Sequence, residues 1–361
     1  MDNIICNNNN YNLSNSHFRF KKQTNNFKHV ARLENDLYEK KMVYCKNCGK
    51  FGHPYKKCKE PIASYGIICF RLLDSDTQQL ISYDEILDQN IKIEFLLIQR
   101  KHTLGYMEFI RGKYFISDVY SIMILFKQMV QEEIDLIACN SFDYHWDLLW
   151  QYKCNKSSIY RTEYENSKRK FNYLKNNTDS NINLRYIICN ITPKFNNKEW
   201  GMPKGRRNNY ESNIQSAVRE FQEETSYNNK EYKIMNNFDE YTEIFNGTNG
   251  IKYLHTYFIA NCLTNRTPNL INEFKSNEIG NIQWFTFEET CKKLRSYHTE
   301  KIRIITEINK LLIERINNVS LKKIDSKTEL SDLDNSTDVS DSTCIDNSSE
   351  INNSSEINII E

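Results

Sequence analysis

Three glutamates fall within one turn of a predicted helix over residues 212–225. Glu220, Glu223 and Glu224 are spaced i, i+3 and i+4, which places their carboxylates on one helical face. Three like charges this close repel one another and would weaken an isolated helix. A bound divalent cation would relieve that repulsion, and hard oxygen ligands suit Mg²⁺ or Mn²⁺ beside a substrate phosphate. The alternative interpretation is a solvated acidic helix face that binds nothing.

The residues around these glutamates indicate how the helix is held. Its apolar positions form a separate stripe roughly 120° from the carboxylates, at 100° per residue, and this stripe can pack against a sheet. The stripe consists of Ile214, Ala217, Val218 and Phe221. The loop before the helix carries Lys204, Arg206 and Arg207. We expect these cations to contact the phosphate oxygens of a substrate.

A second cluster of ligand-type residues has the spacing C-x2-C-x4-H-x4-C. It consists of Cys45, Cys48, His53 and Cys58. Three thiolates and one imidazole form a closed ligand set that is typical of structural zinc. The 14 residues from Cys45 to Cys58 are too few to fold by apolar burial, so the metal would supply the folding free energy.

The same segment resembles the CCHC zinc knuckle of retroviral nucleocapsid proteins. That resemblance implies binding of single-stranded nucleic acid through exposed aromatic and basic side chains. Phe51 and Tyr55, which lie among several lysines, suit this role. The alternative is a zinc clip that serves only as a structural staple or a protein contact.

The elements that must position these residues follow from hydrophobic patterning. Apolar runs predict strands at residues 65–73, 91–98, 184–191 and 251–260. Helical spacing of apolar residues predicts a small helical subdomain over about 117–180. It also predicts a final helix at 300–316. Residues 286–289 (TFEE) form a capping box that opens a further helix. Together these elements predict an α+β protein.

The spacing of Gly205, Glu211 and the run 219–224 (REFQEE) resembles the Nudix box, a glycine, glutamate and REUxEE pattern. The pattern has one departure, because Ser226 stands where the family has a glycine. The resemblance implies a Nudix α/β/α sandwich with a mixed sheet and a helical subdomain inserted on its N-terminal side. It also implies that Glu220, Glu223 and Glu224 bind the metal. Glu211 and Arg219 are expected to brace the loop against the helix.

Several further segments together resemble the mRNA-decapping Nudix hydrolases of large cytoplasmic DNA viruses, over residues 62–316. These segments are EFIRGKY (108–114), EWGMPKGRR (199–207) and EI…WF…EE (278–289). The resemblance implies hydrolysis of an m7GpppN cap to m7GDP and 5′-monophosphate RNA. It assigns Glu278, just before an Ile-x-x-Ile-x-Trp strand, as the candidate general base. The alternatives are that Glu278 is an exposed turn residue without a catalytic role, and that Glu223 and Glu224 share the base role. An aromatic pair should stack on the methylated guanine. The candidates are Phe109, Tyr114, Tyr253 and Tyr257.

Two other functions remain open at this point. The same box also occurs in hydrolases of diphosphoinositol polyphosphates and of dinucleotide polyphosphates. The net positive charge of residues 1–324 suits those anionic substrates too. The zinc knuckle favours a polymeric substrate over either of them. A protein of another class, an RNA-binding protein with an inactive Nudix domain, is disfavoured because all three glutamates are intact.

Charge and composition suggest how the chain is organised. Residues 325–361 carry ten acidic residues and one lysine, a net charge of −9, which leaves +10 on residues 1–324. A basic body suits a polyanionic partner such as capped mRNA or single-stranded RNA. We predict five regions. They are a flexible Asn-rich arm (1–40), the zinc knuckle (41–60), N-terminal strands with the helical subdomain (61–183), the Nudix hydrolase domain (184–318) and a disordered acidic tail (319–361).

The eleven cysteines indicate the compartment. Their odd number and mostly apolar surroundings favour reduced thiols over a disulfide framework. No apolar stretch approaches the 18 residues of a membrane span, and the first residues do not resemble a secretory leader. We therefore expect a cytoplasmic protein, in the host cytoplasm if it is viral.

Overall fold

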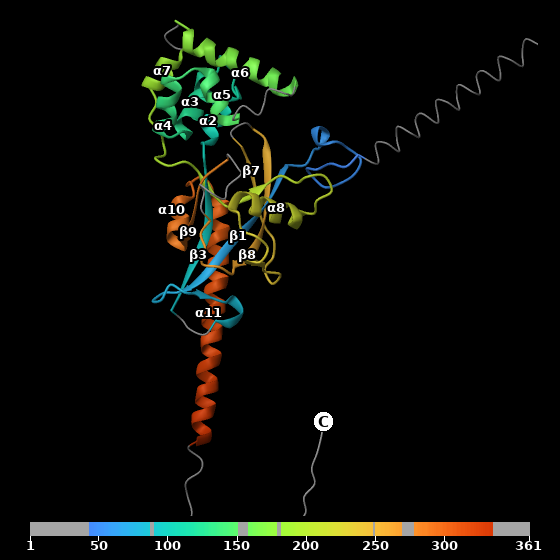
Figure 1. Cartoon of the computed structure of the whole chain (residues 1–361), viewed down its shortest axis with the longest axis vertical. Helices are drawn as coiled ribbons and strands as arrows, with labels where there is room; N and C mark the ends of the chain where they lie inside the picture. The colour runs from blue at the N-terminus through green and yellow to red at the C-terminus, as the bar shows by residue number, and fades with distance from the viewer. Residues whose placement is uncertain are drawn as a thin grey trace, which may run out of the picture.

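The computed structural model describes residues 43–86, 90–150, 158–178, 182–247, 250–268 and 278–334. The predicted arm at 1–40 and residues 335–361 of the predicted tail lie outside these ranges. The described residues form a mixed sheet with helices on its faces, an all-helical subdomain and a small Cys/His-containing loop (Figure 1). This architecture confirms the predicted α+β fold.

Two long strands form the centre of the sheet. Strand β1 (Ile62–Asp74) and strand β8 (Lys252–Cys262) pair in parallel over nine residue pairs. Strand β3 (Ile91–Arg100) is antiparallel to β1, β9 (Ile279–Thr286) is antiparallel to β3, and β7 (Tyr241–Asn246) is antiparallel to β8. The shorter strands are β2 (Leu80–Ile81), β4 (Trp200–Gly201), β5 (Lys204–Gly205) and β6 (Tyr232–Ile234). The strands predicted at 65–73, 91–98 and 251–260 are therefore confirmed.

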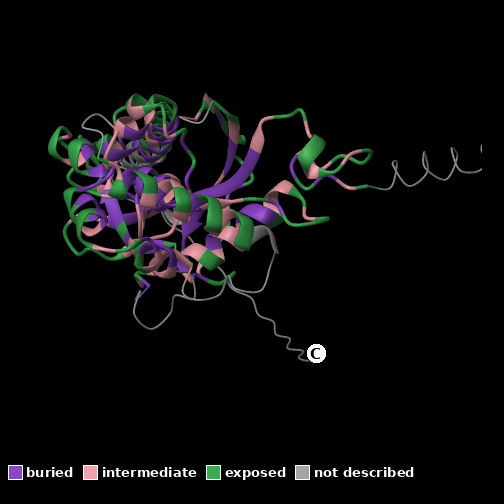
Figure 2. Ribbon diagram, turned by 90° about the horizontal axis from the view of Figure 1, so that it is seen from above, coloured by how far each residue is buried: buried purple, intermediate pink, exposed green. Residues whose placement is uncertain are grey.

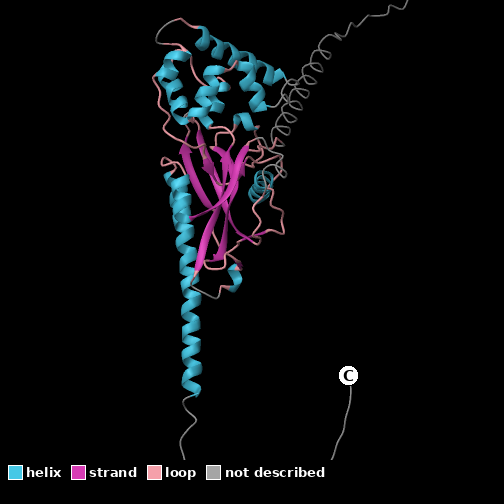
Figure 3. Ribbon diagram, turned by 60° about the vertical axis from the view of Figure 1, so that its left-hand side comes forward, coloured by secondary structure: helices cyan, strands magenta, loops and turns pink. Residues whose placement is uncertain are grey.

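Strand β1 contributes side chains to the hydrophobic core on each face of the sheet, because successive side chains of a strand point to opposite faces. Phe70 and Leu72 pack in the core beneath α11 (Thr299–Asp334). Ile67 packs on the other face, beneath α8 (Asn213–Thr225). Figure 3 shows the sheet lying between the long α11 and the short α8. The sheet is thus the middle layer of the predicted α/β/α sandwich.

The C-terminal helices follow the predictions in part. Helix α10 (Phe287–Lys293) begins at the expected capping box, in which Thr286 and Glu289 bond reciprocally to each other's backbone N–H. Helix α11 continues to Asp334, although the sequence predicted disorder from residue 319. Residues 319–334 contain no glycine or proline, so the local sequence does not interrupt the helix.

The helices between β3 and β4 form a separate core, visible above the sheet in Figure 1. They are α2 (Leu104–Ile110), α3 (Val119–Gln128), α4 (Gln131–Cys139), α5 (Phe142–Trp150), α6 (Ser158–Asn176) and α7 (Leu184–Cys189). Phe109, Phe126 and Phe171 are among the aromatic residues that fill this core. A helical subdomain is therefore present, as predicted.

The strand predicted at 184–191 is wrong, because this segment is helix α7. Asn183 caps the helix, since its side-chain oxygen accepts a hydrogen bond from the backbone N–H of Tyr186 at 2.6 Å. Leu184 and Ile187, three positions apart, are both buried in the helical core. A short apolar run of this kind fits either a strand or a buried helix, and tertiary packing decides between them.

The helical subdomain is inserted between strands that belong to one continuous sheet. Strands β1 and β3 precede the subdomain and β8 and β9 follow it, yet β1 pairs with β8 and β3 pairs with β9. In Figure 2 the strands are largely buried, whereas the outer faces of the helices are exposed. Across the described part of the chain, no helix has the length and apolarity required to traverse a bilayer.

One buried histidine makes the stability of this fold depend on pH. His145 is fully buried in the helical core, and its Nδ1 lies 2.7 Å from the Tyr106 hydroxyl. Burial lowers the pKa of His145 from 6.5 to about 4. The unfolded chain therefore takes up a proton as the pH falls through 6.5, while the folded chain stays neutral until about 4. This contribution to stability is complete above pH 6.5 and is lost toward pH 4.

We predict that His145→Gln flattens this pH dependence. Between pH 6 and 4.5, the free energy of unfolding of the wild type should fall more steeply than that of the variant, by up to about 1.4 kcal/mol per pH unit. Urea denaturation at several pH values measures both slopes. Parallel slopes would show that the pKa of His145 is the same in the folded and unfolded chains.

Candidate active site and metal centres

Helix α8 presents the three predicted metal-binding carboxylates. Ser212 caps the helix and forms a capping box with Gln215, so the helix begins where the sequence predicts. Ala217 and Phe221 are fully buried against the sheet, and the glutamates occupy the remaining faces. The helix ends at Ser226, which adopts a left-handed conformation with φ of 59°. A serine therefore supplies the backbone turn for which glycine is preferred.

Strand β5 passes directly alongside these carboxylates. The backbone N–H of Lys204 donates to Glu224 Oε2 at 2.7 Å. A Cβ atom at Gly205 would overlap the carboxylate of Glu220, so any larger residue there would force that carboxylate to move. Because residue 205 has no side chain, the loop backbone can approach both Glu220 and Glu224. This approach explains the glycine in the Gly205, Glu211 and 219–224 pattern.

Arg219 links the loop to the carboxylate face. Its guanidinium contacts Glu211 at 2.7 Å, Glu220 at 2.8 Å and Glu223 at 3.1 Å. It also donates to the backbone carbonyl of Arg206 at 2.8 Å. The expected contact between Glu211 and Arg219 is therefore present. The same arginine also neutralises two of the glutamates, which the sequence did not suggest.

Burial gives the site its electrostatic character. It raises the pKa of Glu224 to about 7 and lowers the pKa of Lys204 to about 8, the latter with help from the charge of Arg100. The pKa of Glu220 is also raised, first by burial and then by the charges of Glu223 and Glu278. Buried carboxylates that hinder one another's ionisation, with oxygen as the only donor atom, fit a hard divalent cation.

The remaining predicted catalytic residues lie in different environments. Glu278 is exposed at the start of β9, and its effect on the pKa of Glu220 places it near the carboxylate face. Arg206 is also exposed. Arg207 is instead buried, where its guanidinium lies 4.7 Å from the ring centroid of Tyr65 and donates to the Tyr65 hydroxyl at 2.6 Å. Arg207 is therefore engaged within the protein and does not point toward a substrate.

Most of the aromatic candidates for cap binding are in the interior. Phe109 and Tyr114 stack on each other in the helical core with centroids 5.3 Å apart. Tyr257 is fully buried in the sheet. Tyr253 is only half-buried and stacks on Phe245 at 5.5 Å. Of these four candidates, only Tyr253 exposes part of its ring in this structure.

A buried polar network adjoins the site, and sequence reasoning missed it. Glu243 Oε1 lies 2.6 Å from His255 Nδ1 and 3.2 Å from the ammonium of Lys301, and it accepts from the Tyr257 hydroxyl at 3.0 Å. Burial alone would raise the pKa of Glu243, but His255 and Lys301 lower it to about 2. The charge of Lys204 helps to lower the pKa of His255, so the network lies close to the active-site loop. Its members come from three elements, β7, β8 and α11, and no local motif links Glu243 and Lys301 to the β8 residues.

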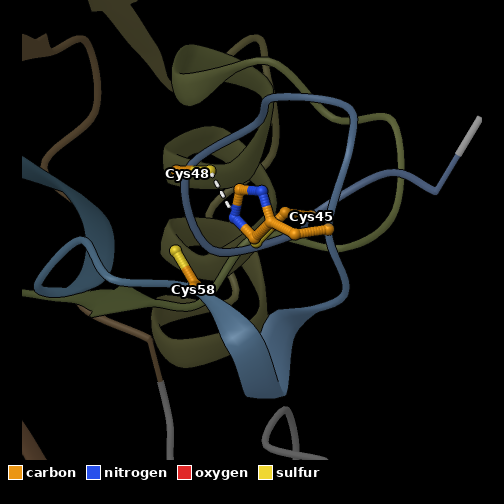
Figure 4. Close-up of side chains that lie close together, drawn as sticks. Cys45, Cys48 and Cys58 are labelled. Carbon is orange, nitrogen blue, oxygen red and sulfur yellow. Dashed lines mark hydrogen bonds between the residues drawn. The ribbon is translucent and has the colours of Figure 1, made fainter. Parts of the chain in front are cut away.

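The predicted zinc ligands converge in space. Among the described residues they are the one group of three or more Cys, His, Asp or Glu side chains whose ligand atoms all lie within 4.8 Å of one another. Cys48 Sγ and His53 Nε2 are 3.5 Å apart (Figure 4). The amide of Asn47 donates to Cys58 Sγ at 3.3 Å. Burial alone would raise the pKa of Cys58, but hydrogen bonds from Asn47 and His53 lower it to about 6, which favours the metal-binding thiolate.

We predict that Gly205→Ala weakens Mn²⁺ binding, because the added methyl group must displace the Glu220 carboxylate. Gly201→Ala is the matched control, since a Cβ atom there meets nothing within 4 Å. Electron paramagnetic resonance of free Mn²⁺ measures the affinity of each protein. We expect a loss of at least about tenfold for Gly205→Ala alone. Equal affinities would show that Glu220 does not bind the cation.

Zinc binding is tested separately from the Nudix site. Purified protein should contain one zinc per chain by elemental analysis, and Cys48→Ser should lose it, because serine is a poor zinc ligand. Cys139→Ser is the control, since Cys139 is an exposed thiol on α4. Retention of stoichiometric zinc by the Cys48 variant would rule out the four-ligand set.

Comparison with known proteins agrees with this geometry. A protein-family model for the NUDIX domain matches residues 186–307. A protein of Acanthamoeba polyphaga mimivirus described as "Putative mRNA-decapping protein" is 32% identical over 363 residues, which cover 79% of this chain and 100% of the relative. The mRNA-decapping protein g5R of African swine fever virus (isolate Pig/Kenya/KEN-50/1950) is 31% identical over 55% of this chain and 80% of its own length.

A solved structure, the C. elegans Ap4A hydrolase binary complex, shares 13% identity and has a TM-score of 0.32. It covers 68% of this chain and 96% of the hydrolase. The family assignment depends instead on the sequence relatives and on the glutamate face of α8. The chain belongs to the Nudix hydrolase family.

Proposed function

We propose that this protein removes the m7G cap from mRNA, hydrolysing a phosphoanhydride bond to release m7GDP and 5′-monophosphate RNA. The observation that carries the proposal is the carboxylate face of α8, with Glu220 and Glu224 against the Lys204–Gly205 backbone. The relatives named as mRNA-decapping proteins support the choice of substrate. The proposed site of action is the cytoplasm of an infected host cell.

Glu220, Glu223 and Glu224 are the residues that would hold Mg²⁺ or Mn²⁺. When bound, such ions neutralise the pyrophosphate and lower the pKa of a nearby water. Arg219 forms ion pairs with Glu220 and Glu223 in this structure. At least one of these ion pairs would have to break for a cation to bind the glutamates. The contacts of Arg219 with Glu211 and with the Arg206 carbonyl would keep its guanidinium beside the site.

The remaining roles go to residues around the carboxylate face. Glu278, near Glu220, accepts the proton of the attacking water in this proposal. Lys204 and the exposed Arg206 offset the charge that develops on the departing phosphate. Tyr253 is the aromatic candidate best placed to contact the cap, because its ring is not fully buried.

Glu223→Gln tests whether the domain is an active hydrolase. Glu223 is largely exposed and pairs with Arg219, so the substitution should leave the fold intact. With Mn²⁺ and cap-labelled RNA, we expect release of labelled m7GDP to fall by at least about 100-fold. Glu288→Gln, which changes an exposed glutamate on α10, is the matched control. Full activity of the Glu223 variant would show that Glu223 is not a metal ligand, and no release of m7GDP by the wild type would favour an RNA-binding protein without Nudix catalysis.

The substrate class needs its own comparison. The wild type should hydrolyse long capped RNA more efficiently, by kcat/KM, than a diphosphoinositol polyphosphate or a dinucleotide polyphosphate. A preference for either small molecule would replace the decapping assignment while keeping the hydrolase.

A further inference from the structure

The zinc knuckle, residues 43–60, packs against the Nudix loop, residues 206–211. The Tyr44 hydroxyl donates to the backbone carbonyl of Glu211 at 3.3 Å. The rings of Tyr44 and Tyr210 stack with centroids 4.9 Å apart and planes 29° apart. The knuckle therefore touches the segment that leads directly into the carboxylate helix.

Two anchors fix the orientation of the knuckle. Arg207 lies against Gly49, where a Cβ atom would overlap the guanidinium and where φ is +75°. Asn47, which is buried, donates to the Pro61 carbonyl at 2.9 Å and accepts from the Ala63 N–H at 2.9 Å. Because the knuckle is held to the Nudix loop and to the start of β1, its surface continues the surface of the Nudix domain.

Three aromatic rings follow one another across this junction. Phe51 packs edge-on against Tyr44 at 5.4 Å, and Tyr44 stacks on Tyr210. The outer rings are open to solvent, since Phe51 is 56% exposed and Tyr210 is 72% exposed. Tyr210 also adopts φ of +65°, a conformation that costs roughly 1–2 kcal/mol for a residue other than glycine. An exposed aromatic residue in a strained conformation points to a binding role.

The surroundings of these rings are positively charged. The knuckle carries Lys46, Lys50, Lys56, Lys57 and Lys59 against the single acidic residue Glu60. Arg206, on the Nudix loop, is exposed as well. Exposed rings among cations suit a single-stranded nucleic acid, whose bases stack on aromatics while its phosphates pair with lysine and arginine.

We propose that Tyr210, Tyr44 and Phe51 form one RNA-binding surface that takes the single-stranded segment following the cap. The Nudix loop and the knuckle then bind the same RNA strand, with Tyr210 nearer the carboxylate helix and Phe51 farther from it. This inference rests on the proposed function for the identity of the RNA. The surface itself is defined by the contacts between the zinc knuckle and the Nudix loop.

The first test measures RNA binding without catalysis. Fluorescence anisotropy of an uncapped single-stranded RNA, with no Mg²⁺ or Mn²⁺, gives the affinity of each variant. Tyr210→Ala and Phe51→Ala should each weaken binding by about 5- to 150-fold, the range expected for losing one stacked base. Tyr210→Phe keeps the ring and should bind like the wild type. Tyr120→Ala, on α3, is the control, because Tyr120 is 73% exposed.

The second test uses turnover. The ratio of kcat/KM for a capped RNA of about 30 nucleotides to that for the cap dinucleotide should fall in Tyr210→Ala, mainly through KM. Zinc content and thermal unfolding confirm that each variant is folded. Equal RNA affinity for all variants would overturn the RNA surface and favour a protein-contact role. Weakened RNA binding in a protein that does not cleave capped RNA would retain the surface and reject decapping.

Discussion

The active site depends on one guanidinium. Three glutamates on a single helical turn repel one another, and Arg219 offsets that repulsion through contacts with Glu220 and Glu223. Its remaining donors reach Glu211 and the carbonyl of Arg206, so the same side chain ties the loop to the helix. Arginine suits both tasks because its planar fork carries five N–H donors in a fixed geometry. The site is thereby stable before a cation arrives and retains excess negative charge to attract one.

The rest of the fold positions this helix. The sheet buries the apolar side of α8, and β5 brings its backbone against the carboxylates because Gly205 has no side chain. Strand β1 pairs with β5 and follows the Cys/His loop, so both candidate metal sites adjoin the same strand. The Glu243 network adds buried charge near the active-site loop. The carboxylate helix, the Cys/His loop and the proposed RNA surface therefore all adjoin strand β1.

Local patterns predicted the elements whose chemistry is local. The spacing of the Cys/His residues was sufficient to predict that they converge, because one tight loop brings them together. The apolar pattern and cap around the glutamates were sufficient to predict the helix α8 that carries them. Sequence failed where distant packing decides. Residues 184–191 form a helix because the helical core accepts Leu184 and Ile187, and Phe109 and Tyr114 stack in that same core. The burial of Arg207 against Tyr65 could not be foreseen, since 142 positions separate the two residues.

The parallel pairing of β1 with β8 has a consequence for biosynthesis. Each of the nine β1 residues that pair with β8 has its partner 191 positions later, for example Ile62 with Tyr253. At 5–20 residues per second, a ribosome needs roughly 10–40 s to deliver the second strand. During that interval all four Cys/His residues of the knuckle have already been synthesised, whereas the apolar faces of β1 and β3 stay uncovered. Nascent chains should therefore depend on chaperones until β8 has been synthesised.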